Sequence, residues 1–305
     1  MLDYIDVKPE VKEALENNRP VVALESTIIS HGMSYPENIE SARTCESEIR
    51  KEGAVPATIA IIGGRMKVGL DDDELQYMGE NKGIRKASRR DIPMIMAKRL
   101  DGATTVATTM LISNLAGIKV FATGGIGGVH RNAQQTFDIS ADLMELANTN
   151  VAVVCAGAKS ILDIGLTLEY LETQGVTVIG YKTDDFPAFY TRRSGFGVDY
   201  NADSAKVIAK AIKVKEDLHL KGGMVIGNPI PKEYEMDYDF INEAINKAVE
   251  DAEKRGIKGK DITPFILAKI HNITEGKSLY SNKKLVYNNA RVASRIAKEL
   301  CCLRY

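Results

Sequence analysis

Residues 120–131 read Val-Phe-Ala-Thr-Gly-Gly-Ile-Gly-Gly-Val-His-Arg, an apolar run that enters a glycine-rich turn. A short apolar run that stops at glycines is typical of a buried strand in a parallel α/β sheet. Similar runs predict further strands over residues 21–24, 58–62, 104–107, 151–155, 176–181 and 224–226. Amphipathic segments lie between them, among them 9–16 and 36–53, so strands and helices alternate as a mainly parallel sheet requires.

The last third of the chain is predicted to be mostly helical. Apolar residues at helical spacing indicate core-facing helices over residues 203–218, 240–255, 263–273 and 278–300. The segment 182–201 is rich in glycine, arginine and aromatic residues and has no clear period, which fits a lid, a subunit contact or a surface loop. No internal repeat is present, so we expect one α/β domain over residues 1–305 with a helical C-terminal layer.

Composition argues against several classes of partner. The 305 residues include 40 basic and 41 acidic side chains, for a net charge of -1, and no tryptophan. The chain therefore has neither a basic field nor an aromatic platform for a nucleic acid polymer. Its apolar runs are too short to cross a membrane, and its N-terminus lacks the apolar stretch of a signal peptide. Four cysteines without metal-binding spacing are typical of reduced thiols, so we expect a cytoplasmic protein.

Residues with useful chemistry follow three of the predicted strands. Glu25 follows the first, the glycine-rich turn and His130 follow the strand at 120–123, and Lys159 follows the strand at 151–155. In parallel α/β sheets, ligands bind beyond the carboxyl ends of the strands. The sequence therefore predicts one site that combines a carboxylate, a glycine-rich turn and a lysine.

The glycine-rich turn fits neither common nucleotide-binding motif. His130 stands where the dinucleotide fingerprint needs its third glycine, and Ala158 replaces the P-loop glycine that precedes the lysine. Two interpretations stay open. The glycines let backbone N–H groups approach a phosphate, with His130 or Arg131 adding charge, or they form a tight turn that needs positive φ angles.

Lys159 lies among small residues at the end of an apolar run, unlike the usual solvent-facing lysine. Such a lysine can be desolvated and act as a neutral amine nucleophile, and pairing with a phosphate is the alternative. Farther upstream, Ser140 is a natural N-cap and Asp142 suits the first turn of the helix that follows. Asp138 precedes this cap and is available to hold a metal ion. The basic segment 82–90 is either a solvated face or a wall of an anion site.

Longer motifs resemble one known family. They lie at residues 21–32, 55–60, 86–91, 120–142, 155–160 (Cys-Ala-Gly-Ala-Lys-Ser) and 228–231 (Asn-Pro-Ile-Pro). Taken in this order, they are similar to the pseudouridine-5'-phosphate glycosidases, also called the indigoidine-A-like family. The resemblance runs from Pro9 to Lys298, nearly the whole chain.

The resemblance implies an α/β/α sandwich that assembles as a homotrimer. It also implies reversible cleavage of the C–C glycosidic bond of pseudouridine 5'-phosphate to uracil and ribose 5-phosphate, in pseudouridine catabolism, through a covalent lysine–ribose intermediate. By this resemblance Lys159 is the nucleophile, Glu25 is the proton donor, and Asp138 holds a divalent metal ion, typically manganese. The residues expected to contact the substrate are Lys86, Val106, Thr123, His130, Ser140, Ala141, Asp142 and Asn282.

The chemistry of a C–C bond accounts for the lysine. An ordinary glycosidase uses two carboxylates because its leaving group is an oxygen that an acid can protonate. A ring carbon of uracil is a poorer leaving group, whereas an amine that adds at C1' opens the sugar and lets an iminium take up charge. Three alternatives remain: a two-carboxylate glycosidase built on Glu25 and Asp138, a sugar-phosphate sensor without catalysis, and a nicotinamide enzyme, which the incomplete glycine fingerprint disfavours.

Overall fold

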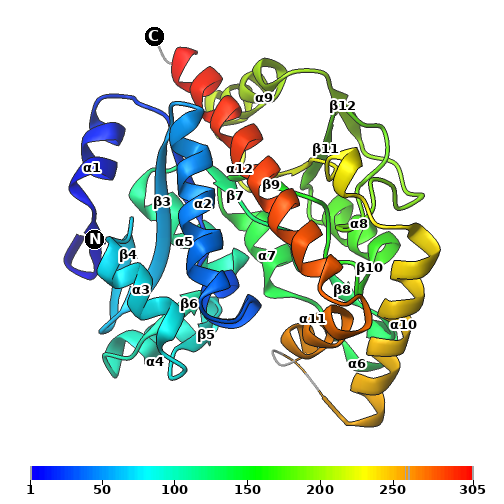
Figure 1. Cartoon of the computed structure of the whole chain (residues 1–305). Coiled ribbons are helices and arrows are strands. Elements are labelled where there is room, and N and C mark those ends of the chain that lie inside the picture. Colours follow the sequence, from blue (N-terminus) through cyan, green and yellow to red (C-terminus); the bar gives the residue numbers. More distant parts are fainter. Residues whose placement is uncertain (1, 258, 260–261, 304–305) are drawn as a thin grey trace.

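A computed structural model describes residues 2–257, 259 and 262–303, and an eleven-stranded sheet runs through this part of the chain (Figure 1). Its strands are β1 (Ile5–Val7), β2 (Val21–Leu24), β3 (Val55–Ile62), β4 (Arg65–Val68), β5 (Arg85–Ala87), β6 (Gly102–Thr104), β7 (Val120–Ala122), β9 (Ala152–Cys155), β11 (Thr177–Tyr181), β12 (Tyr200–Ala202) and β13 (Met224–Gly227). The main path follows the order β1-β4-β3-β2-β7-β9-β13-β11-β12, and β6 joins β3 and pairs with β5.

The strands at the centre of the sheet are parallel. The sheet extends from β2 toward one edge and from β7 toward the other. Strand β2 pairs in parallel with β3 on one side and with β7 on the other. Strands β9 and β13 continue in parallel from β7, whereas β4 and β6 run antiparallel to β3. The strand order therefore reverses between β2 and β7, and such a reversal opens a crevice for ligands beyond the strand ends.

Helices cover both faces of this sheet. The helices α2 (Glu37–Lys51), α12 (Lys277–Cys302) and α9 (Ala205–Asp217) pack together over one face, with α12 crossing the sheet in red in Figure 1. The helices α5 (Val106–Ala116), α7 (Ala141–Asn148) and α8 (Ile164–Thr173) form the second layer behind it. Phe121 and Val153 are fully buried in the sheet between these layers. The expected α/β/α sandwich is confirmed.

The other helical elements flank these layers. They are α1 (Pro9–Glu16), α3 (Asp72–Glu80), α4 (Ile92–Ala97), α6 (Ala133–Thr136), α10 (Tyr238–Lys254), α11 (Ile262–Ile273), the 3-10 turns η1 (Leu2–Tyr4), η3 (Arg89–Asp91) and η4 (Lys232–Tyr234), and the π-helical turn η2 (Ile28–Gly32). Helix α10 packs on α11, and α11 packs on α12, so the predicted C-terminal helical layer is confirmed. Among the described helices, none has both the length and the hydropathy of a membrane span.

One predicted strand is wrong. The run 104–107 was expected to be extended, but β6 ends at Thr104 and helix α5 begins at Val106. Between them Thr105 has extended backbone angles, and its side chain accepts a hydrogen bond from the N–H of Thr108. The threonine that caps the helix thus ends the strand at Thr104, three residues earlier than the apolar pattern suggests. The extent of the single domain over residues 1–305 stays a prediction.

Candidate active site

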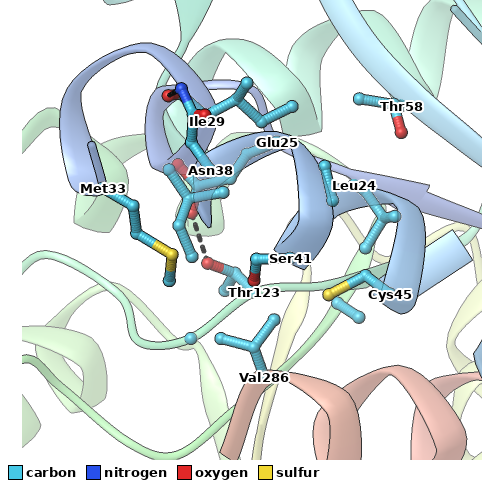
Figure 2. Close-up of a pocket in the computed structure, with 14 residues that line it drawn as sticks. Leu24, Glu25, Ile29, Met33, Asn38, Ser41, Cys45, Thr58, Thr123 and Val286 are labelled. Atoms are coloured by element: carbon cyan, nitrogen blue, oxygen red, sulfur yellow. Dashed lines mark hydrogen bonds between the residues drawn. The ribbon is translucent and has the colours of Figure 1, made fainter. Parts of the chain in front are cut away.

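A carboxylate and a hydroxyl meet at the crevice between β2 and β7. Glu25 follows the last residue of β2, and Thr123 follows the last residue of β7. The Oγ1 of Thr123 donates a hydrogen bond to the Oε1 of Glu25, drawn as a dashed line in Figure 2. The structure thus brings these two strand-end residues together, as the sequence predicts.

The surroundings of Glu25 favour a protonated carboxyl group. A mostly apolar pocket lies against it, lined by residues of β2, η2, α2 and α12 (Figure 2). Burial raises the pKa of Glu25, because the ionised form loses hydration there. The positive charge of Lys159 and the hydrogen bond from Thr123 oppose this rise, whereas the charge of Asp142 adds to it. A carboxyl group with a raised pKa can hold a proton near neutral pH and then transfer it.

Lys159 lies in the loop after β9. Its backbone N–H donates to the carbonyl of Ile126 at 3.0 Å, which ties this loop to the glycine-rich turn. Its charge lowers the pKa of both Glu25 and His130, so the ammonium group acts on both of these side chains. In the described part of the chain, no hydrogen bond or ion pair holds the Nζ atom. Burial raises the pKa of the nearby Cys155 thiol to about 12, so this thiol stays protonated at neutral pH.

Close packing, rather than backbone conformation, explains the glycines of the turn at 124–128. None of them is among the described residues with a positive φ angle, so the tight-turn interpretation is wrong. A Cβ added to Gly127 would lie 2.2 Å from the Oγ of Ser140 and 2.6 Å from the Oδ2 of Asp142. The N–H of Gly127 donates to this Oδ2 at 2.8 Å, and the N–H of Val129 donates to a threonine hydroxyl at 2.9 Å. These two N–H groups are therefore not offered to a phosphate.

His130 lies on the short strand β8 (Val129–His130), which pairs with β10 (Leu162–Asp163). Its N–H donates to the carbonyl of Asp138 at 3.0 Å. Burial lowers the pKa of His130, and the charges of Lys159 and Lys86 lower it further, although Asp138 acts in the opposite direction. The imidazole is therefore neutral at pH 7, and the positive charge that the sequence assigned to it is absent.

Lys86 supplies a positive charge to the same region. It lies on β5, and its charge lowers the pKa of both Glu25 and His130. Arg131, the other residue expected to add charge beside the turn, donates from Nη1 to the Oδ1 of Asn246 on α10 at 2.8 Å. The basic side of the site is therefore formed by Lys86 and Lys159.

The N-termini of α5 and α7 bring further predicted residues to the site. Val106 is the buried first residue of α5, and Ala141 is the first residue of α7. Ser140 caps α7 as predicted, because its Oγ accepts from the N–H of Asp142 at 3.2 Å. Asp142 does more than suit a helix terminus: its buried carboxylate also accepts from the N–H of Ala107 at 2.9 Å, which joins the two helices to the glycine-rich turn.

The donors for a metal ion are few. The carboxylate of Asp138 has no hydrogen bond or ion pair within the described residues, and these contain no group of three or more His, Cys, Asp or Glu side chains that could hold a metal. A hard divalent ion such as Mg²⁺ or Mn²⁺ can be held through one or two carboxylates while it keeps several waters. Asp138 fits an ion bound in this way and does not fit one enclosed by protein ligands.

Helix α12 faces the glycine-rich turn with three residues of one stripe. A Cβ on Gly124 would lie 3.2 Å from Val286 and 3.5 Å from the Oδ1 of Asn282. This Oδ1 is buried and has no hydrogen-bond partner among the described residues, so it can accept from a ligand. One turn beyond Val286, Asn289 donates to the carbonyl of Thr123. Sequence reasoning missed Asn289, and the signal was its seven-residue spacing from Asn282 on an apolar face.

The segment 182–201 is not a plain surface loop. Phe186, Phe189 and Tyr190 are buried, and the N–H of Phe189 donates to the carbonyl of Ala156 at 2.8 Å. Gly157, which has a φ angle of +81°, faces this segment so closely that a Cβ would lie 1.8 Å from the carbonyl oxygen of Pro187. The segment therefore packs directly on the loop that carries the lysine.

Fold and site together define an α/β/α enzyme whose reactive side chains gather beyond the carboxyl ends of parallel strands. The chain belongs to the family described as "Indigoidine synthase A like protein", whose model matches residues 10–299. It is 68% identical over 298 residues to the pseudouridine-5'-phosphate glycosidase of Clostridium botulinum, and the match covers 97% of each chain. It is 60% identical to the Escherichia coli protein of the same name, over 97% of this chain and 96% of the relative.

Two solved structures share the fold. The prealnumycin C-glycosynthase AlnA, solved in complex with ribulose 5-phosphate, superimposes with a TM-score of 0.92 at 38% identity and covers 99% of this chain and 98% of its own. An indigoidine synthase A (IdgA)-like protein of Thermotoga maritima superimposes with a TM-score of 0.89 at 33% identity, over 97% of this chain and 96% of its own. These relatives favour an enzyme over a sensor of sugar phosphates.

Proposed function

We propose that this enzyme cleaves the C–C glycosidic bond of pseudouridine 5'-phosphate reversibly, giving uracil and ribose 5-phosphate. The identity of 57–68% to glycosidases of that name supports the substrate, because it extends over nearly the whole chain. The observation that carries the mechanism is the pairing of a carboxyl group whose pKa is raised with a lysine whose Nζ atom has no protein partner in the described chain.

The amine of Lys159 is the proposed nucleophile. Its Nζ lone pair forms a bond to C1', and the C1'–O4' bond breaks with its electron pair going to O4'. As the ring opens, O4' takes up a proton and the attacking nitrogen loses one, which restores its lone pair. The nitrogen lone pair then forms the C1'=N bond while the bond to C5 of uracil breaks, and C5 receives a proton. Water hydrolyses the resulting iminium, which releases ribose 5-phosphate and restores the amine.

Glu25 is the proposed proton donor in this sequence. Burial raises its pKa, and a general acid works best when its pKa lies near the working pH. Thr123 holds the carboxyl group by its hydrogen bond, so the donor has a fixed orientation toward the crevice. This assignment uses one carboxyl group and one amine, unlike the two-carboxylate alternative.

The substrate is proposed to lie between the turn at 123–130 and helix α12. Its phosphate is assigned to Lys86 and His130, with Ser140, Ala141 and Asp142 at the α7 terminus. A neutral imidazole can donate one hydrogen bond to a phosphate, and the dianion itself favours protonation of the ring. The sugar and base are assigned to Val106 and to Asn282, whose buried Oδ1 can accept a hydrogen bond from a uracil N–H.

A divalent ion, Mn²⁺ by the family resemblance, is proposed to bind at Asp138. The ion would supply positive charge that helps to order the substrate phosphate and water. Asp138 contributes a carboxylate that no described residue engages by a hydrogen bond or an ion pair, and waters would complete the coordination. No step of the bond cleavage described above is assigned to the ion.

The assembly and the location of the enzyme are also proposed. We infer a homotrimer, which the 82% exposure of the Phe137 side chain supports, because a large apolar group in water is typical of an interface. We also infer a cytoplasmic enzyme, since none of the four cysteines, all of which lie among the described residues, forms a disulfide. Light scattering during size-exclusion chromatography measures the mass of the assembly. A mass of one or two chains contradicts the homotrimer.

One assay tests the proposed function. Purified enzyme is incubated with pseudouridine 5'-phosphate, and uracil release is followed with and without a chelator. Release of uracil together with an equal amount of ribose 5-phosphate is the expected result. Absence of release with added Mn²⁺, under conditions in which the protein is folded, contradicts the proposal. Loss of release on chelation, restored by Mn²⁺, supports the metal assignment.

A further inference from the structure

Two buried side-chain amides support the turn that carries Thr123, whose hydroxyl donates to Glu25. Asn289 of α12 is fully buried, and its Nδ2 donates to the carbonyls of Thr123 at 2.8 Å and of Gly124 at 3.4 Å. Asn228 follows β13 and is also buried, and its Nδ2 donates to the Oδ1 of Asn289 at 2.8 Å. The Nδ2 groups of both amides and the Oδ1 of Asn289 thus form hydrogen bonds to the turn or within the pair.

This amide pair connects three neighbouring strand ends. The N–H of Asn228, beyond β13, donates to the carbonyl of Cys155 at the end of β9 at 2.8 Å. The N–H of Thr123, beyond β7, donates to the carbonyl of Val154 at 3.0 Å. Asn289 therefore lies where the strand that leads to Lys159 and the turn that holds Glu25 are fixed relative to each other.

Packing alone does not account for a polar side chain at this place. The neighbours of Asn289 along the same face of α12 are Leu285, Val286, Val292 and Ala293, all buried and apolar. A buried amide costs free energy unless its partners satisfy it, whereas a fully satisfied network selects one arrangement of the backbone. The carbonyls of Thr123 and Gly124 are the groups whose arrangement this network selects.

We propose that Asn289 is a positioning residue for the reaction, which holds the turn at 123–124 so that the hydroxyl of Thr123 stays aimed at the carboxyl group of Glu25. The inference rests on the role proposed for Glu25. Asn289 itself lies behind the turn and is linked to Glu25 through Thr123. Asn228 supports it by fixing the orientation of its amide.

The proposal has a consequence for pH dependence. The groups that act on the carboxyl group of Glu25 are Lys159, Thr123 and Lys86, which lower its pKa, and Asp142, which raises it. Cleavage needs the protonated form, so kcat falls as the pH rises through the pKa of Glu25. Loss of the hydrogen bond from Thr123 raises this pKa, and the high-pH limb of the kcat profile then moves to higher pH.

The experiment compares pH profiles of kcat and KM for Thr123→Val, Asn289→Leu and the double variant. Thr123→Val removes the hydroxyl, and Asn289→Leu removes the amide at similar volume. We expect both single variants to move the high-pH limb of the kcat profile to higher pH. Asn289→Leu should also lower kcat about tenfold with little change in KM. In the double variant the high-pH limb should lie at the same pH as in Thr123→Val, because Asn289 acts through Thr123.

The control is Val292→Ala, a truncation of a buried apolar residue one turn along the same helix, which removes packing but no hydrogen bond of the turn or of the amide pair. This control should lower the melting temperature and leave the high-pH limb of the kcat profile at its wild-type position. If Asn289→Leu behaves like this control while Thr123→Val moves the limb, the inference is wrong and the role of Glu25 stands. If Thr123→Val leaves the limb unmoved, the role proposed for Glu25 fails, and the inference fails with it.

A second variant covers the case in which Asn289→Leu does not fold. Asn228→Ala removes the hydrogen bond that orients Asn289 and leaves Asn289 itself in place. We expect it to move the limb in the same direction by a smaller amount. A folded Asn228→Ala enzyme with the wild-type profile contradicts the inference.

Discussion

Thr123 and Glu25 follow neighbouring strands from which the chain proceeds to opposite edges of the sheet, and their side chains meet by a hydrogen bond. The bond crosses the point at which the strand order reverses, and it joins two residues that are 98 positions apart in the sequence where β2 and β7 pair. The proposed acid is thus fixed by the central parallel pair of the sheet.

Replacement of Lys159 by alanine is expected to abolish both uracil release and covalent trapping. The amine is the proposed nucleophile, and deletion of a covalent catalyst typically lowers kcat by several orders of magnitude. The measurement is borohydride reduction in the presence of ribose 5-phosphate, followed by mass spectrometry of the intact protein. Lys159→Arg keeps the charge and should also fail to trap, whereas a Lys86→Ala enzyme should still trap. Turnover above about one percent in Lys159→Ala contradicts the covalent mechanism.

Glu25→Gln is expected to bind substrate normally and to lower kcat about a hundredfold or more, because the amide preserves shape but has no proton to transfer. Burial raises the pKa of Glu25, so the wild-type enzyme should lose activity as the pH rises through that raised value. The high-pH limb that belongs to Glu25 should be missing in the variant. Weak binding with a normal kcat at saturation would instead make Glu25 a binding residue.

The phosphate assignment predicts a change in substrate preference. His130→Ala and Lys86→Ala should each lose about 1.5 to 3 kcal/mol of binding, or about ten- to a hundredfold in kcat/KM, on pseudouridine 5'-phosphate. Their kcat/KM on unphosphorylated pseudouridine should change much less. Arg131→Ala is the matched control, since its guanidinium donates to Asn246. An equal loss on both substrates places the phosphate elsewhere, with Arg192 and Arg193 as the next basic pair to test.

Gly157→Ala should reduce kcat as well as stability. The residue has a φ angle of +81°, and a new Cβ would lie 1.8 Å from the carbonyl oxygen of Pro187, so the loop before Lys159 must shift. Gly117→Ala is a matched control, because Gly117 has a φ angle of +87° with no atom within 4 Å of a new Cβ. Both variants should lose about 1 to 2 kcal/mol from the left-handed conformation. Gly157→Ala alone should lose stability beyond this amount and also have a lower kcat. A normal kcat in Gly157→Ala would show that the packing of this loop does not affect catalysis.

Asp138→Asn should weaken the response to Mn²⁺ while leaving the fold unchanged. The carboxylate has no hydrogen-bond or ion-pair partner among the described residues, so its replacement breaks no such bond and removes only its charge beside His130. Isothermal titration of the enzyme with Mn²⁺ measures the binding directly, apart from activity. The expected result is at least a tenfold loss of affinity. Affinity equal to that of the wild-type enzyme means that the ion binds without Asp138.

The sequence located the site because of where strands end. Glu25 and Lys159 each follow an apolar run, and the carboxyl ends of parallel strands meet at one edge of a sheet. That rule needs only the strand positions and their direction. The α/β/α layers follow from the same alternation of strand and helix, which is why the fold was predictable from the pattern and the family motifs.

Other features depend on contacts between distant segments, and pattern does not reveal them. The neutral state of His130 results from burial and from the charges of Lys86 and Lys159, which the fold brings to it. The role of Gly127 results from its contact with Ser140 and Asp142 rather than from its own backbone angles. In each case the residue type was noticed in the sequence, but its physical environment belongs to the tertiary structure.

The packing of Phe189 and Pro187 on the loop before Lys159 limits how the enzyme can be re-engineered. The two segments interlock through the backbone of Gly157 and the N–H of Phe189, not only through exchangeable side chains. A chimera that imports residues 182–201 from a relative must therefore also import the complementary loop at 156–159. Grafting either piece alone would introduce a mismatch at the nucleophile, so the two form a single module for protein engineering.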